Sequence, residues 1–152
     1  MEAKVTRRSV PNADLLEYVR ELVASGKTVE IPARGNSMLP SIRDGRDSIE
    51  LVAPDHPAPG SIALCLLPSG NYVLHRIVSI DKRRVVLHGD GNLVGDELCR
   101  PSDILALAVA IVRPSGKRIS CSDPSYNRKI RLWLSAPYFV RRVCLGILRR
   151  IL

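Results

Sequence analysis

The sequence has few aromatic residues and no long apolar run. One Trp, four Tyr and one Phe make up 4% of its 152 residues, too few rings for a surface that stacks single-stranded nucleic-acid bases. No stretch reaches the roughly 18 consecutive apolar residues of a membrane-spanning helix. Residues 1–10 are charged and predict neither a secretory signal nor a membrane anchor. We therefore expect a cytoplasmic protein.

Closely spaced metal ligands are also absent. The four cysteines, Cys65, Cys99, Cys121 and Cys144, lie far apart, and no histidine completes a zinc-binding pattern with them. We expect reduced thiols that pack as small apolar side chains. The sequence predicts no bound metal and no cofactor.

Acidic residues are missing from the end of the chain, where the positive charge is concentrated. The sequence carries 23 Lys and Arg against 15 Asp and Glu, a formal net charge of +8. Residues 128–152 hold seven basic residues and no acid, so they account for nearly all of this excess. Residues 1–127 are close to neutral, and we do not expect nucleic acid as a partner.

Apolar residues make up 45% of the chain, which is enough for one folded domain over residues 1–152. We expect a loose N-terminus over 1–10 and a helix within 11–26, followed by a β body over 27–113. Residues 114–152 are expected to form a polar linker and a basic tail helix. Inside the first helix, an apolar stripe runs from an N-cap at Asn12 to Ser25, and Gly26 is expected to end it.

After Gly26 the apolar pattern changes to the period of strands. Six short apolar runs are separated by turn-forming residues such as Asp44-Gly45 and Pro68-Ser69-Gly70-Asn71. They predict strands at Thr28–Pro32, Ser48–Val52, Ser61–Leu67, Tyr72–Ile80, Arg84–Leu87 and Ile104–Val112. The expected fold class is mainly β, a compact, barrel-like antiparallel fold with an N-terminal helix and a basic amphipathic C-terminal helix.

The tail is expected to differ from the β body. Lys117–Asn127 is polar and predicted to be irregular, with Pro124 as a breaker. Beyond Pro137 a helix is predicted, with four arginines on or beside the side opposite to its apolar residues. The apolar residues are Val140, Val143, Cys144, Ile147, Leu148 and Ile151. Either this helix packs on the β body with a solvated arginine face, or residues 137–152 contact an anionic membrane surface.

Three segments hold residues that could do chemistry. Ser37 lies in the turn Gly35-Asn36-Ser37-Met38-Leu39-Pro40, where a nucleophile would be held exposed. A serine hydroxyl needs a base to take its proton, and His75 lies in an otherwise apolar strand. His88–Asp96 is a glycine-rich loop with two carboxylates, Asp90 and Asp96, either of which could orient an imidazole. Taken singly, a serine in such a loop is usually only a turn residue, and a histidine in such a strand is usually a core or solvent-facing residue. The two aspartates could equally be turn residues.

In this order the three segments resemble the type I signal peptidase and LexA-like peptidase superfamily. The resemblance covers Val29–Val112 and is closest to the branch with a histidine base and to small members without a membrane anchor. It implies that Ser37 is the nucleophile and His75 the general base. Asp96, or else Asp90, would be the acidic partner of His75. The residues that would line the substrate and the oxyanion are Gly35, Asn36 and Met38.

The resemblance implies a serine endopeptidase that acts on a peptide or protein, such as a leader or modified peptide. Two departures from the family pattern stand out. Gly35 lacks the hydroxyl that some relatives carry there, and Gly60-Ser61 replaces the usual Gly-Asp pair. We expect Arg76 to project from the strand face opposite to His75 and to pair with Asp47 or Glu50. The alternative is a non-catalytic module that binds an extended peptide by strand addition.

Overall fold

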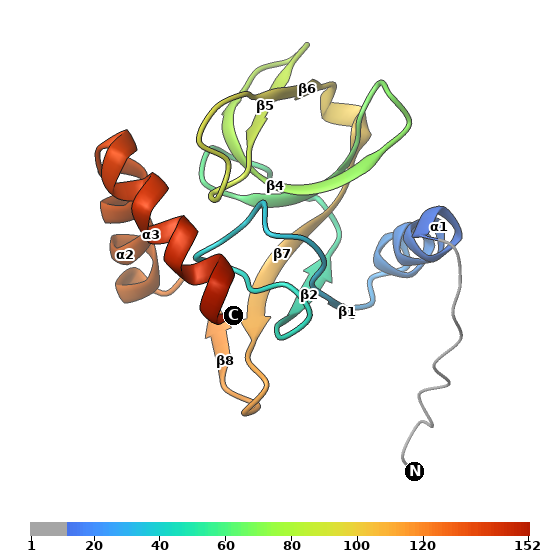
Figure 1. Cartoon of the computed structure of the whole chain (residues 1–152). Helices are drawn as coiled ribbons and strands as arrows, with labels where there is room; N and C mark the ends of the chain where they lie inside the picture. The colour runs from blue at the N-terminus through green and yellow to red at the C-terminus, as the bar shows by residue number, and fades with distance from the viewer. Residues whose placement is uncertain (1–11) are drawn as a thin grey trace.

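The computed structural model describes residues 12–152, which form one antiparallel sheet of eight strands and three α-helices (Figure 1). The elements in chain order are α1 (Asn12–Ala24), β1 (Val29–Pro32), β2 (Ser48–Val52), β3 (Ile62–Leu66), β4 (Tyr72–Ile80), β5 (Val85–His88), β6 (Glu97–Cys99), a 3₁₀ turn (Pro101–Asp103), β7 (Ile104–Val112), β8 (Arg118–Ser120), α2 (Pro124–Ser135) and α3 (Tyr138–Ile151). The prediction of a mainly β fold with helices at both ends of the chain is confirmed. No helix of the described residues is long and apolar enough to cross a membrane.

The strands are ordered β1-β2-β7-β3-β4-β5-β6, with β8 paired to β7. All pairs are antiparallel. Over the described residues β1 and β6 end this path without pairing to each other, so the sheet is open rather than closed into a barrel. Shifts of register between Glu50 and Leu51, Leu64 and Cys65, and near Val78 allow it to bend.

Both faces of the sheet carry a hydrophobic core. In β3, Ile62 and Leu64 belong to the larger cluster, which also covers α1, β2 and part of α2. Ala63 and Cys65, the alternate residues, belong to a second cluster with residues of β4, β5 and β6. Because successive side chains of a strand point to opposite faces, a strand buried on both sides reads as an unbroken apolar run.

The predicted N-terminal helix is present and ends close to the predicted residue. Val19 and Val23 are buried on its inner side. Gly26 has a φ of 87°, and the Lys27 N–H donates to the Leu22 carbonyl at 3.1 Å, which is the usual way for a glycine to end a helix. The expectation of a loose segment over 1–10 lies outside the described residues.

The segment Lys117–Asn127 is not irregular, contrary to prediction. It contains β8 and the start of α2, whose first residue is Pro124. The Asp123 side chain accepts the Ser125 N–H at 3.1 Å and so caps the helix. Proline at the first helical position needs no hydrogen bond for its missing N–H, so Pro124 begins a helix instead of breaking one. The short strand β6 was also not predicted.

Candidate active site

Ser37 lies in the loop between β1 and β2, which is closed by hydrogen bonds on both sides. At the base of the loop, the Ala33 N–H donates to the Asp47 carbonyl at 2.8 Å. Nearer the serine, the Gly35 N–H donates to Asp44 Oδ1, also at 2.8 Å. Gly35 has a φ of 81°, a left-handed conformation that glycine adopts without strain. The serine is therefore carried by a loop of defined shape.

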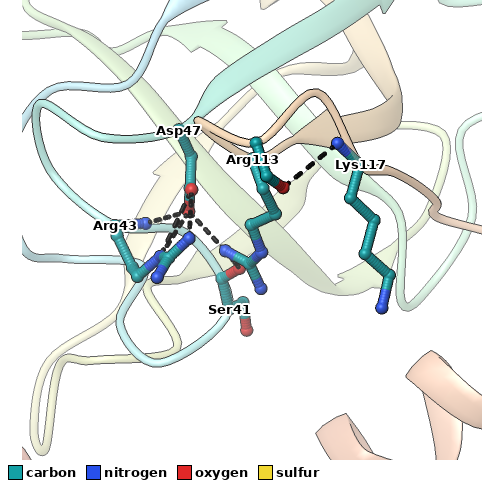
Figure 2. Close-up of polar contacts among 6 residues, drawn as sticks. Ser41, Arg43, Asp47, Arg113 and Lys117 are labelled. Atoms are coloured by element: carbon teal, nitrogen blue, oxygen red, sulfur yellow. Dashed lines mark hydrogen bonds and ion pairs between the residues drawn. The ribbon is translucent and has the colours of Figure 1, made fainter.

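A buried carboxylate, Asp47, ties this loop to the sheet (Figure 2). Its Oδ2 accepts the Arg43 N–H at 2.7 Å, and its Oδ1 accepts Nη2 of Arg43 at 3.0 Å. Nη1 of Arg113, the residue that follows β7, donates to Oδ2 as well. A buried charge is tolerated only when it is paired and hydrogen-bonded, and two guanidinium groups satisfy Asp47 here.

The Ser37 carbonyl packs against the glycine-rich loop that follows β5. The Gly91 N–H donates to it at 2.8 Å. A Cβ added to Gly89 would lie 2.4 Å from the Ser37 oxygen, and one added to Gly91 would lie 2.6 Å from the Asn36 oxygen. Both distances are far below van der Waals contact, so only glycine lets the two loops approach this closely.

Gly89→Ala is expected to lower the free energy of unfolding by about 1–3 kcal/mol, because the added methyl group would force the two loops apart. Equilibrium unfolding in urea measures the change. Gly146→Ala is the matched control: an added Cβ there meets nothing within 4 Å, and alanine is the better helix former in α3. Equal destabilisation by both substitutions would contradict the close approach of the loops.

His75 is buried in β4. Arg76 pairs with His88 across β4 and β5, and Gly89 follows β5 directly. His75 pairs with Ala63 of β3, and opposite residues of antiparallel strands point to the same face, so the His75 ring lies on the face of the second core cluster. The Cβ position of Gly89 nearly touches the Ser37 oxygen, so the turn that follows β5 connects this pair of strands to the Ser37 loop.

Serine and histidine are not hydrogen-bonded to each other in this structure. Within residues 12–152, neither the Ser37 hydroxyl nor Nε2 of His75 takes part in a hydrogen bond, and the Ser37 N–H donates none. Nucleophile and base are often loosely placed without substrate. The hydroxyl, Nε2 and the N–H are therefore all unengaged by the described residues.

The other ring nitrogen of His75 is held by Glu97, whose Oε2 lies 2.9 Å from Nδ1. Glu97 is opposite Leu87, and Leu87 is opposite Ile77, so Glu97 lies on the same face as His75. An ionised carboxylate only accepts hydrogen bonds, so Nδ1 carries a proton, and in the neutral ring Nε2 presents a lone pair. Sequence reasoning missed Glu97. The available signal was its spacing of two residues from the apolar Cys99, which in a strand places both side chains on the same face.

Asp96 does not support His75, contrary to the first of the two predicted assignments. Strand alternation turns it to the opposite face, where its Oδ1 lies 2.7 Å from Nδ1 of His88. Nε2 of His88 lies 2.7 Å from the Asn92 carbonyl. Asp96 and His88 therefore form a separate pair that spans the glycine-rich loop.

Asp90, the second predicted partner of His75, is fully buried and bound to Arg76 instead. Nε and Nη2 of Arg76 donate to its two carboxylate oxygens at 2.8 and 2.7 Å, and the Ser41 hydroxyl donates to Oδ2 at 2.5 Å. Nη1 of Arg76 donates to the Gly60 carbonyl at 2.8 Å. Burial acts to lower the pKa of Arg76, but the hydrogen bonds and charge of Asp90 outweigh it and hold that pKa above its ordinary value.

This pair also corrects the predicted partner of Arg76. Arg76 projects from the face opposite to His75, as alternation predicts, but it meets Asp90 rather than Asp47 or Glu50. The two predicted carboxylates have other guanidinium partners in the structure. The strand residue after His75 therefore anchors the same glycine-rich loop that packs against Ser37.

The remaining predicted residues line the loop in different ways. Met38 is buried in the larger core, and its sulfur accepts the Asp90 N–H at 3.4 Å. Asn36 is exposed, and its carbonyl accepts the Leu39 N–H at 3.2 Å. The N–H of Gly35 is already engaged, so the Ser37 N–H is the better candidate to stabilise an oxyanion.

The C-terminal helices also hold the glycine-rich loop, which sequence reasoning did not anticipate. Nε1 of Trp133 in α2 donates to the carbonyl of residue 90 at 2.8 Å. From α3, Nη2 of Arg141 and Nη2 of Arg149 donate to the carbonyls of residues 92 and 91, at 3.4 and 3.5 Å. The loop is thus held between the Ser37 loop, Arg76 and two helices.

Metal-ligating side chains form no cluster, and the cysteine thiols form no disulfide, over the residues that the structure describes. Over residues 12–152, no group of three or more His, Cys, Asp or Glu side chains comes together as for a metal ion. All four cysteines are free. Burial raises the pKa of the Cys65 and Cys99 thiols and raises that of Cys121 to about 11, so these three stay protonated at neutral pH.

Comparison of this chain with protein-family models, with curated proteins and with solved structures found no match in any of the three. What the chain does is therefore inferred from the contacts described above and from the three segments of its sequence.

Proposed function

We propose that this protein is a serine peptidase of the signal-peptidase-like type, which cleaves a peptide bond by acyl transfer at Ser37. His75 is the general base and Glu97 orients it. The observation that carries the proposal is the 2.9 Å contact between His75 Nδ1 and Glu97. The Ser37 loop packs against Gly89, which follows β5, the strand paired to that of His75. Serine, imidazole and carboxylate are the three groups that such a reaction requires.

In the proposed reaction, Nε2 of His75 removes the proton from the Ser37 hydroxyl as the oxygen attacks the carbonyl carbon of the scissile peptide. The imidazolium that forms is stabilised by Glu97 and gives its proton to the leaving amine. Water, activated by the same nitrogen, then releases the acyl group from Ser37. The reaction requires the Ser37 hydroxyl and Nε2 of His75 to meet, and the described residues engage neither of them.

The negative charge on the carbonyl oxygen also needs a donor. Such a donor is typically worth about 2.7–4 kcal/mol of transition-state stabilisation. The Ser37 N–H supports this role because the described residues leave it without an acceptor. The loop that carries it is held by Asp47 and by Gly91, so the donor would not have to reorganise during the reaction.

The proposed substrate is a peptide or protein segment, with a leader or modified peptide as the expected kind. The test is incubation of the full chain with a peptide library, with products identified by mass spectrometry. Cleavage is expected with the wild type and with Ser69→Ala, which removes an exposed serine from a different turn. Ser37→Ala is expected to give no products. Cleavage that persists in Ser37→Ala would refute Ser37 as the nucleophile.

A second candidate function is peptide binding without cleavage. Two observations favour it: among residues 12–152 nothing pairs with the outer edges of β1 and β6, where a strand could add, and Ser37 and His75 are not hydrogen-bonded to each other. In this case the wild type and Ser37→Ala would bind library peptides with equal affinity, and neither would cleave them. Product formation by the wild type separates the two functions.

A further inference from the structure

The outer side of α3 carries a row of apolar side chains that no described residue covers. Phe139, Val143, Ile147 and Ile151 are spaced four residues apart and so follow one side of the helix. Their exposed fractions are 73, 45, 55 and 67%. Isolated exposed apolar residues need no explanation, but a row along a whole helix marks an interaction surface.

The helix is held in place by its other side. Leu145 is 1% exposed, and the guanidinium carbon of Arg141 lies 5.7 Å from the centre of the Trp133 ring. Figure 1 shows α3 beside α2 at one side of the sheet. The packing predicted for this helix, with its apolar side on the β body and a solvated arginine face, is therefore wrong: Leu145 lies on the inner side with Arg141, and most of the predicted apolar side is exposed.

Basic residues accompany the apolar row. Arg142 and Arg150 are exposed and lie three residues after Phe139 and Ile147, so each is a neighbour of an apolar side chain on the helix surface. Residues 128–152 contain seven basic residues and no acidic one. A second copy of this helix would be repelled, and a nucleic acid would leave the apolar row exposed to water.

We propose that α3 docks on the surface of an anionic lipid bilayer. The apolar row enters the boundary between headgroups and acyl chains, while Arg142 and Arg150 pair with lipid phosphates. The helix has 14 residues and lies along the surface rather than across it. This inference does not depend on the proposed peptidase activity. Its consequence is that the glycine-rich loop, held by Arg141 and Arg149, is brought close to the lipid surface.

The test is co-sedimentation of the full chain with vesicles of phosphatidylcholine alone or with phosphatidylglycerol added. The wild type is expected to pellet with the anionic vesicles and not with the neutral ones. Phe139→Gln/Ile147→Gln should bind the anionic vesicles at least about tenfold more weakly, through loss of apolar burial. Arg142→Gln/Arg150→Gln should bind them about 30-fold more weakly, at about 1 kcal/mol for each arginine.

The matched control is Tyr18→Gln/Val78→Thr, which removes two equally exposed apolar side chains from α1 and β4. It should bind like the wild type, and circular dichroism should show the same fold for every variant. Equal pelleting with neutral and anionic vesicles, or unchanged binding of the Phe139→Gln/Ile147→Gln variant, would overturn the proposal. Two other results would overturn it if the wild type bound no vesicles. One is a wild-type dimer that the Phe139→Gln/Ile147→Gln variant no longer forms, and the other is DNA binding that this variant keeps.

Discussion

Replacing Glu97 with glutamine is expected to lower kcat for peptide cleavage by about 10⁴-fold, with little loss of stability. The carboxylate accepts a hydrogen bond from the Nδ1–H of His75 and so leaves Nε2 able to take the proton of Ser37. An amide can instead donate to Nδ1 and favour the tautomer with the proton on Nε2. In serine peptidases, this exchange of carboxylate for amide costs about 10⁴ in kcat while the geometry is kept.

The neighbouring residue supplies the matched control. Asp96→Asn changes a carboxylate that faces His88 rather than His75, so kcat should stay close to that of the wild type. Nitrogen NMR of the His75 ring gives a readout that does not need turnover: the wild type should carry its proton on Nδ1, and Glu97→Gln should shift it to Nε2. If Asp96→Asn were the damaging variant, Glu97 would not be the residue that orients His75.

Arg76→Met is expected to lower the free energy of unfolding by about 3–5 kcal/mol, measured by urea denaturation at neutral pH. The substitution leaves the Asp90 carboxylate buried, with the Ser41 hydroxyl as its remaining side-chain donor. It also removes the donor to the Gly60 carbonyl. Stability is lost because the Asp90 charge stays buried without its partner. This loss is much larger than the net contribution of the Arg76–Asp90 pair to the free energy of unfolding.

An exposed ion pair serves as the comparison for this prediction. Arg118→Met breaks the contact with Glu50 at the surface and should cost less than about 1 kcal/mol. In the double variant Arg76→Met/Asp90→Asn the buried site is neutral, so the loss should be smaller than the sum of the two single losses. Additive losses, or equal costs for Arg76→Met and Arg118→Met, would show that the Arg76–Asp90 pair is not shielded from water.

The buried pair also connects the two proposals. Asp90 meets Arg76 through its side chain and Trp133 through its carbonyl, and the next residues of its loop contact α3. One short loop therefore contacts α2, α3 with its exposed apolar row, and the loop that carries Ser37. When α3 is bound to lipid, its contacts with this loop through Arg141 and Arg149 place the loop next to the lipid surface.

Local patterns in the sequence were sufficient for most of the secondary structure. The six predicted strands are all present, because alternating or continuous apolar runs between turn formers leave few other ways to bury their side chains. The first helix and its glycine end follow from the same kind of local rule. Pro124 was misread because a proline that starts a helix and one that breaks a helix differ only in what precedes them, here the capping side chain of Asp123.

The chain by itself determined that a serine in a tight turn, a histidine in a core strand and a cluster of acids are present. Only the tertiary structure decided which acid meets the histidine. Asp90, Asp96 and Glu97 lie within eight residues of one another, and all have the same chemistry at short range. The pairing of β5 with β6 turns Glu97 to the face of His75 and Asp96 away from it, and burial directs Asp90 to Arg76. Such choices depend on register and on contacts between distant strands, which no local pattern encodes.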